Sequence, residues 1–168
     1  MTTVYLNGAW TPMAEARISP MDRGFLFGDG IYEVVPSYGG RLVGFGPHMR
    51  RMRDGLAALE IDPGLSEDAW RALVEELIER NGAGNLGIYL HVSRGAYEKR
   101  NHAFPEETEA TVFAYTFEIP PAPSGDPAAV KRYRVSTAED LRWKRCHIKS
   151  TALLGNVMHM RQGQAAGN

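Results

Sequence analysis

A proline-rich segment divides this chain of 168 residues into two unequal parts. Four prolines fall within Pro120–Pro127, and prolines at this density make a backbone stiff and extended. The residues before this segment are enough for one small domain, whereas residues 130–168 are too few to close a second core. We therefore expect a small domain over residues 1–119, a linker over residues 120–129, and the incomplete start of a larger domain over residues 130–168.

The composition narrows the class of protein. Apolar residues make up 43% of the chain and the formal net charge is −1, values typical of a globular, soluble protein. Basic residues cluster only at Arg142–Lys149, so we expect no nucleic-acid partner. Cys146 has no cysteine to pair with, the first residues lack the features of a secretory signal, and no apolar run is long enough to cross a bilayer. A cytoplasmic protein without a membrane partner is expected.

Turn residues and alternating hydrophobicity predict an antiparallel sheet in the first part. Asn7-Gly8 and Tyr38-Gly39-Gly40-Arg41 each predict a tight hairpin. Apolar residues alternate over Leu86–Ser93, which predicts a strand with one core face and one polar face. Further strands are predicted over residues 31–36 and 110–119.

Two helices are expected to pack on this sheet. Pro47 is predicted to open the first, which places Met49, Met52 and Leu56 on one face. Ser66 is predicted to cap the second, which Asn81-Gly82 ends. The expected fold class is therefore α+β, a small domain of antiparallel sheet with two helices that is followed by the first strands and helix of a second domain.

The part of the chain after the linker contains the basic segment Arg142–Lys149. Residues 130–137 are predicted to form a strand, residues 141–150 a strand or an extended segment, and residues 152 to about 166 a helix. In a strand, Arg145, His147 and Lys149 would share one face, and neighbouring positive charge with partial burial favours the neutral amine that condenses with an aldehyde. From these residues alone, an exposed basic strand edge explains Lys149 more simply.

The long polar connection over residues 94–108 carries Arg100-Asn101-His102. The Arg100 guanidinium can grip a carboxylate with two parallel hydrogen bonds, and His102 can add a further donor beside it. The alternative is a solvated loop in which Lys99 and Arg100 balance nearby glutamates.

The segment Phe27–Glu33 is also open to two interpretations. Its Gly28-Asp29-Gly30 run can let a ligand approach the backbone closely, or can simply form a turn before a strand. Tyr32 and Glu33 point to opposite faces of that strand, so at most one of them lines a given cavity. The histidines show no spacing typical of metal ligands, and no metal site is expected.

Taken together, these segments resemble the class IV (fold type IV) aminotransferases that use pyridoxal phosphate, and most closely the branch of D-amino-acid aminotransferases. The resemblance covers the whole chain. It follows, in chain order, Arg23–Glu33, His48–Arg51, Arg94-Gly95, Arg100–Pro105 and Arg142–Leu154. Family members are usually much longer, so the resemblance implies that this chain corresponds to an N-terminal portion. The remainder, which could be a separate chain, would supply the acidic residue at the pyridine nitrogen and part of the phosphate site.

The resemblance implies roles for five residues. Lys149 matches the lysine that forms a Schiff base with pyridoxal phosphate and moves the substrate α-proton, and Arg51 matches the arginine that holds the cofactor phosphate. Tyr32, Arg100 and His102 match the residues that bind the substrate α-carboxylate. In the family the loop with the last two reaches the neighbouring subunit, which implies a homodimer. The implied reaction is transamination between a D-amino acid and a 2-keto acid.

Other functions remain open at this point. A branched-chain aminotransferase and an aminodeoxychorismate lyase share the fold, although Arg100-Asn101-His102 favours the D-specific branch. His147 departs from the family, whose close members often carry an acidic residue there. A catalytically silent domain that self-associates through uncovered strands and apolar surface is the alternative of a different class.

Overall fold

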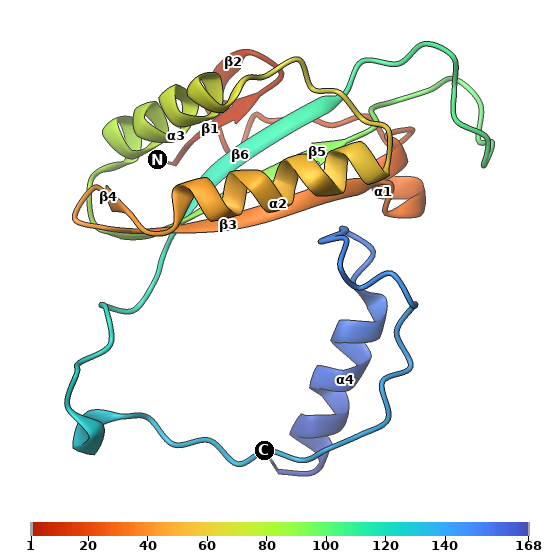
Figure 1. Cartoon of the computed structure of the whole chain (residues 1–168). Helices are drawn as coiled ribbons and strands as arrows, with labels where there is room; N and C mark the ends of the chain where they lie inside the picture. The colour runs from red at the N-terminus through yellow and green to blue at the C-terminus, as the bar shows by residue number, and fades with distance from the viewer. Residues whose placement is uncertain (1, 168) are drawn as a thin grey trace.

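The computed structural model describes residues 2–167 and is built on one sheet layer and one helix layer (Figure 1). Its six-stranded sheet has the order β2-β1-β6-β5-β3-β4, and every pair of neighbours is antiparallel. The expected α+β class is confirmed. The strands are β1 (Thr3–Leu6), β2 (Ala9–Pro12), β3 (Gly30–Tyr38), β4 (Arg41–Leu42), β5 (Asn85–Ser93) and β6 (Thr111–Glu118).

Two helices, α2 (Phe45–Ala58) and α3 (Glu67–Asn81), cover one face of the sheet (Figure 1). Helix α2 begins two residues before the predicted start, and Pro47 lies in its first turn, where a missing N–H costs no intrahelical bond. Ser66 caps α3 as predicted, because its hydroxyl accepts a hydrogen bond from the Ala69 amide at 3.1 Å. The core between the layers is formed by Ile31, Val35, Met49, Met52, Leu56, Trp70, Leu73, Val74, Leu77, Ile88, Leu90 and Val92 among others.

Both predicted hairpins are confirmed. Asn7 and Gly8 have φ angles of 47° and 88°, and Leu6 pairs with Ala9 across the turn. The positive φ angles at both central positions match the right-handed twist of the flanking strands. The second hairpin joins β3 to β4, which is only two residues long.

The predicted alternation along β5 is also confirmed, and it gives the sheet two different faces. Its alternate apolar side chains are buried beneath the helices. On the other face Tyr89 stacks between Tyr32 and Tyr115, with ring centroids 5.7 and 5.1 Å apart. Helices α2 and α3 leave this aromatic face uncovered (Figure 1).

Within residues 2–167 there are two further α-helices, α1 (Arg23–Phe27) and α4 (Leu154–Ala165), and one short 3-10 turn over Pro127–Ala129. The sequence predicted α4 but not α1. None of the helices in these residues is long and apolar enough to traverse a lipid bilayer.

The strand predicted over residues 130–137 is wrong, and of the strand or extended segment predicted over residues 141–150 only the last residues pair with β3. Residues 130–140 form no regular structure, and Lys144–His147 form turns, so Arg145, His147 and Lys149 do not share a strand face. A strand requires a neighbour for its backbone donors and acceptors, and the described structure provides none beside Val130 to Val135. Only the end of this stretch reaches the sheet, where Lys149, Ser150 and Thr151 lie along β3 and Ser150 forms an isolated bridge to Ile31.

The sheet contains one buried hydroxyl that makes no hydrogen bond within residues 2–167, that of Ser37 in β3. We expect Ser37→Ala to raise the free energy of unfolding by about 1 kcal/mol, because a buried polar group without a partner destabilises the folded state. Urea denaturation followed by tryptophan fluorescence measures the change.

Ser93 in β5 provides the matched control. It is equally buried, but its hydroxyl donates a hydrogen bond of 2.7 Å to Asp22. Ser93→Ala should therefore lower the free energy of unfolding by about 1 kcal/mol. Equal losses in the two variants would contradict the assignment of Ser37 as an unsatisfied group.

Candidate active site

The segment that carries Lys149 is attached to the outer edge of β3. The Tyr32 amide donates to the Lys149 carbonyl at 3.1 Å, and the Thr151 amide donates to the Gly30 carbonyl at 3.0 Å. Ile148, next to the lysine, is buried in the core. Lys149 is thus held between these backbone hydrogen bonds and the buried side chain of Ile148, although it does not lie in a strand.

This attachment uses an edge that β4 leaves open. β4 pairs only with Ser37 and Tyr38, at the far end of β3. Pro36 faces the same outer edge, where its carbonyl accepts from Val43, and its missing N–H takes no bond from the ladder with β5. The first half of β3 is therefore available for residues 149–151.

Gly28 is required by the same attachment, and Gly30, the first residue of β3, is required by the close approach of β5. Gly28 has a φ angle of 66°, and a Cβ atom added there would lie 2.8 Å from the Ala152 Cβ. A Cβ added at Gly30 would lie 2.7 Å from the Val92 carbonyl oxygen. The two earlier interpretations, a ligand cradle or a simple turn, are both incomplete, because the glycines here admit another stretch of the same backbone.

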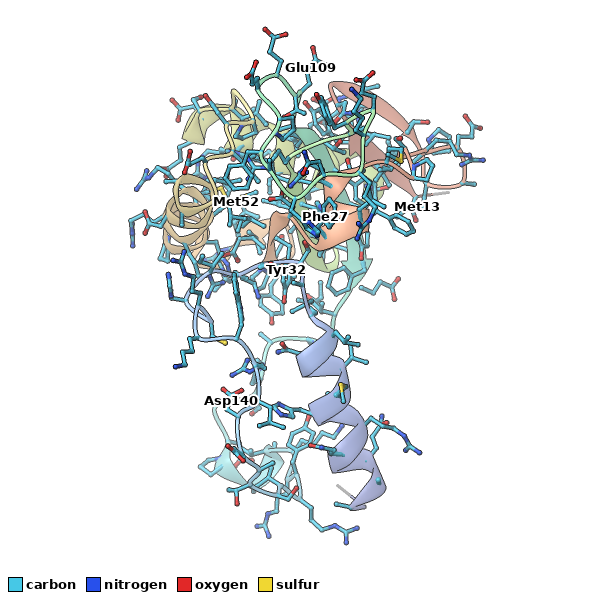
Figure 2. The ribbon with its side chains drawn as sticks, turned by 90° about the vertical axis from the view of Figure 1, so that its right-hand side faces the viewer. Met13, Phe27, Tyr32, Met52, Glu109 and Asp140 are labelled. Atoms are coloured by element: carbon cyan, nitrogen blue, oxygen red, sulfur yellow. The ribbon has the colours of Figure 1, made fainter. Side chains whose placement is uncertain are left out.

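Three of the five predicted site residues line one cavity of about 540 Å³. Tyr32 comes from β3, Arg51 from α2 and Lys149 from the attached segment, and the remaining walls come from residues 141–156. The Lys149 Nζ lies 4.0 Å from the centre of the Tyr32 ring. Figure 2 shows Tyr32 at the side of the sheet that faces the segment leading to α4, and Met52 on the helix-covered side. The volume is typical of sites for small molecules.

Arg51 is held by a carboxylate that the sequence left without a role. Glu33 is fully buried and accepts hydrogen bonds from Arg51 Nε at 2.5 Å and Nη2 at 2.7 Å, and from His48 Nδ1 at 2.7 Å. Burial by itself raises the pKa of Glu33, but the hydrogen bonds and charges of Arg51 and His48 outweigh it and hold the pKa below its ordinary value. The same hydrogen bonds raise the pKa of Arg51. Glu33 is therefore an anion in the folded protein.

Tyr32 packs against Tyr89, which forms a polar aromatic pair with His91 on the open face of the sheet. Tyr89 stacks on the Tyr32 ring, and its hydroxyl lies 3.0 Å from His91 Nδ1. Burial, together with the nearby hydroxyls of Tyr115 and Tyr32, raises the pKa of Tyr89 to about 12. Burial also lowers the pKa of His91, so a neutral phenol and a neutral imidazole underlie the aromatic wall of the cavity.

The structure does not bring Arg100 and His102 to this cavity. Both gather around Phe27 of α1, with the Arg100 guanidinium carbon 5.0 Å and the His102 ring 5.3 Å from the centre of the Phe27 ring. Arg23 fixes their loop, because its Nη1 and Nη2 donate to the carbonyls of Asn101 and His102 at 2.6 and 3.3 Å. The two predicted groups of site residues therefore occupy separate places on one chain.

Asp29 links the loop that carries Arg100 and His102 to the end of α2, through Arg23 and Arg94. It accepts hydrogen bonds from Arg23 Nε at 2.8 Å and from Arg94 Nε and Nη2 at 2.8 and 3.1 Å. Arg94 also donates to the Leu59 carbonyl, which ends α2. Burial raises the pKa of Asp29, but the bonds and charges of Arg94 and Arg23 prevail and lower it. One feature of the sequence could have indicated this cluster of charges. Asp29 lies between two glycines, and Arg23 and Arg94 are arginines with which it could pair.

Residues 30–168 match the family model described as amino-transferase class IV. The chain belongs to this family. Class IV aminotransferases depend on pyridoxal phosphate. Within residues 2–167, this class IV chain contains no group of three or more His, Cys, Asp or Glu side chains that could hold a metal ion.

Among its relatives, a D-alanine aminotransferase of Staphylococcus haemolyticus is 38% identical over 159 residues, which are 94% of this chain and 55% of the relative. This class IV chain therefore spans about half the length of that relative. A branched-chain aminotransferase of Thermoproteus uzoniensis with norvaline superposes with a TM-score of 0.76 at 18% identity, over 99% of this chain and 58% of its own. The branched-chain amino acid aminotransferase from Escherichia coli has a TM-score of 0.65 at 16% identity, over 70% and 41%. At these identities, both structures establish the fold alone.

The attachment of the lysine segment leads to a direct test. Gly28→Ala introduces a side chain against Ala152, so we expect it to weaken the hydrogen bonds between residues 149–151 and β3. Amide hydrogen exchange at Tyr32 and Thr151 should become faster by about tenfold or more.

Gly39→Ala is the matched control for backbone strain. Gly39 has a similar φ angle of 57°, but a Cβ atom there meets nothing within 4 Å. Both variants lose about 1 kcal/mol of stability from the positive φ angle, and only Gly28→Ala should change exchange at Tyr32 and Thr151. The same exchange pattern in both variants would show that the glycine is not needed for this attachment.

Proposed function

We propose that this chain carries the reactive lysine and part of the substrate site of a pyridoxal-phosphate-dependent aminotransferase that transfers an amino group between a D-amino acid and a 2-keto acid. One observation carries the proposal, the meeting of Tyr32, Arg51 and Lys149 in one cavity of a class IV chain. The similarity to D-alanine aminotransferases supports the choice of a D-amino acid.

The residues of the cavity fit the cofactor. Arg51 presents a planar guanidinium that suits the oxygens of a phosphate, and Lys149 presents a primary amine in the same cavity. Arg142 lines the cavity as well and adds positive charge, and the start of α4 beside it has no side-chain cap. When bound, pyridoxal phosphate supplies an aldehyde for an amine and a ring that withdraws electrons.

The work of the chain is to place these groups. The hydrogen bonds of residues 149–151 to β3 and the burial of Ile148 fix the backbone at Lys149, so that Nζ is held at the cavity and can move a proton at the substrate α-carbon. Tyr32 forms the wall beside Lys149, with its ring centre 4.0 Å from Nζ, and its stacking on Tyr89 keeps the ring in place. Arg51 binds the phosphate at a third point. Three fixed contacts of this kind orient a small substrate.

Arg100 and His102 are proposed to bind the substrate carboxylate of a second copy of the chain. Their loop is fixed by Arg23 on the α1 side, away from the cavity that contains Lys149. A homodimer would allow the loop of one copy to complete the cavity of the other. The resemblance to the D-specific branch supports this arrangement.

The division of the chain and its location form part of the same proposal. Residues 120–143 are almost entirely exposed, which supports a linker between a small domain over residues 1–119 and the start of a larger one over residues 130–168. A separate C-terminal portion is a candidate partner for that larger domain. Cys146 is exposed and unpaired, which suits a reducing cytoplasm.

One observation favours a second candidate function, a silent domain that self-associates. Large apolar side chains are exposed in the last part of the chain, including Tyr133, Val135, Leu154 and Val157. Exposed apolar surface of this extent is typical of an interaction site. Branched-chain aminotransferase and aminodeoxychorismate lyase activities remain the alternatives within the enzyme family.

Treatment with pyridoxal phosphate and borohydride separates an enzyme from a silent domain. We expect a stable phosphopyridoxyl adduct on Lys149, identified by peptide mass spectrometry, because borohydride traps an aldehyde joined to an amine. Lys149→Ala should remove the adduct. Lys144→Ala, which changes an exposed lysine nearby, should retain it. Random labelling of exposed lysines with Lys149 unmodified would support the silent domain.

The substrate class is tested in a complete, active protein with Arg100→Ala. Loss of a charged hydrogen bond to the substrate carboxylate should lower kcat/KM for D-alanine by about a hundredfold while the Kd for pyridoxal phosphate changes little. The neighbouring Lys99→Ala is the control and should leave both quantities unchanged. Equal losses of substrate turnover and cofactor binding in Arg100→Ala would contradict a role at the carboxylate.

A further inference from the structure

Arg51 differs from the arginines beside it on α2 in how its guanidinium is held. Its side chain is half-exposed, yet Nε and Nη2 both bind the buried carboxylate of Glu33. Arg50 makes no hydrogen bond or ion pair within residues 2–167, and Arg53 makes only a 4.0 Å contact with the exposed Glu67. Two parallel bonds to one carboxylate fix the plane of the Arg51 guanidinium.

The carboxylate is itself fixed from the other side. His48 lies one helical turn before Arg51 on α2 and donates from Nδ1 to Glu33 Oε2. Glu33 is rooted in β3 directly after Tyr32, whose amide holds the lysine segment. The three-residue unit of Glu33, His48 and Arg51 therefore ties α2 to the same stretch of strand that positions Lys149.

One edge of the guanidinium stays available. Nη1 makes no hydrogen bond to any of residues 2–167, and Arg51 lines the cavity that contains Lys149. The Glu33 carboxylate offsets part of the positive charge of Arg51, which weakens long-range attraction for an anion. The arrangement instead holds the long Arg51 side chain in one orientation before a ligand binds. An arginine side chain without such support loses considerable rotamer entropy when it binds a ligand.

We propose that Glu33 and His48 are positioning residues that hold Arg51 so that its free edge meets the phosphate group of pyridoxal phosphate. This inference rests on the proposed function, because it needs a phosphate-bearing ligand in the cavity. The competing explanation is purely structural, with Glu33 joining α2 to the sheet and having no effect on any ligand.

The two explanations differ in how ligand binding depends on the phosphate. We compare the Kd values of pyridoxal 5′-phosphate and pyridoxal, which lacks the phosphate, for the full chain by titration calorimetry. Glu33→Gln keeps the shape of the side chain but removes its charge. It should weaken binding of pyridoxal 5′-phosphate by about tenfold and leave the Kd of pyridoxal unchanged.

A double variant shows whether Glu33 acts through Arg51. Arg51→Ala should weaken pyridoxal 5′-phosphate binding strongly, and adding Glu33→Gln should cause no further loss, because the group to be positioned is gone. Arg50→Ala on the same helix is the control for a general loss of positive charge and should have little effect. A tenfold loss from Glu33→Gln in the Arg51→Ala background as well would overturn the inference.

His48→Ala provides a milder variant if Glu33→Gln does not fold, as judged by circular dichroism. It removes one of the three hydrogen bonds to Glu33 and should weaken pyridoxal 5′-phosphate binding by about threefold, again without an effect on pyridoxal. Wild-type affinity for pyridoxal 5′-phosphate in the variants, or an equal loss for both ligands, would support the structural explanation. A wild-type chain that binds neither ligand would instead contradict the proposed function, and the inference with it.

Discussion

The site depends on a short antiparallel contact between residues 149–151 and the outer edge of β3. Two backbone hydrogen bonds and the burial of Ile148 bring a lysine from the far end of the chain to a tyrosine near its beginning. Because backbone groups make the contact, it tolerates many side chains but requires glycine at position 28, where Ala152 approaches. Gly28, the position of Lys149 and the cavity therefore all depend on this one contact.

A second constraint is the pairing of buried charges. Asp29 and Glu33 are four residues apart, and each carboxylate binds at least one arginine from another element of the chain. Removing one partner of such a pair leaves a charge without compensation, which costs more than the pair itself contributes. These two carboxylates therefore specify how α2, the loop over residues 94–108 and β3 fit together.

Local patterns in the sequence predicted much of the fold. Hydrophobic alternation located β5, helical spacing with Ser66 located α3, and Asn7-Gly8 located the first hairpin. The same reasoning failed over residues 130–147, where strand-like composition has no partner strand beside it. Lys149, Arg51 and Tyr32 were named from resemblance and meet in the structure, whereas Glu33 and Asp29 were missed as partners because Arg51 and Arg94 reach them only through the packing of other elements on β3. Their roles in binding and catalysis remain predictions.

The shortness of β4 has a consequence for how such a site can be altered. The outer edge of β3 has a limited number of free donors and acceptors, and β4 and the lysine segment divide them, with Pro36 near the border. Lengthening β4 by a few residues would make it a competitor for the amide of Tyr32. The length of one small hairpin thereby leaves the edge of β3 free for a distant segment of the chain, and insertions in that hairpin would change the position of Lys149 without contacting it.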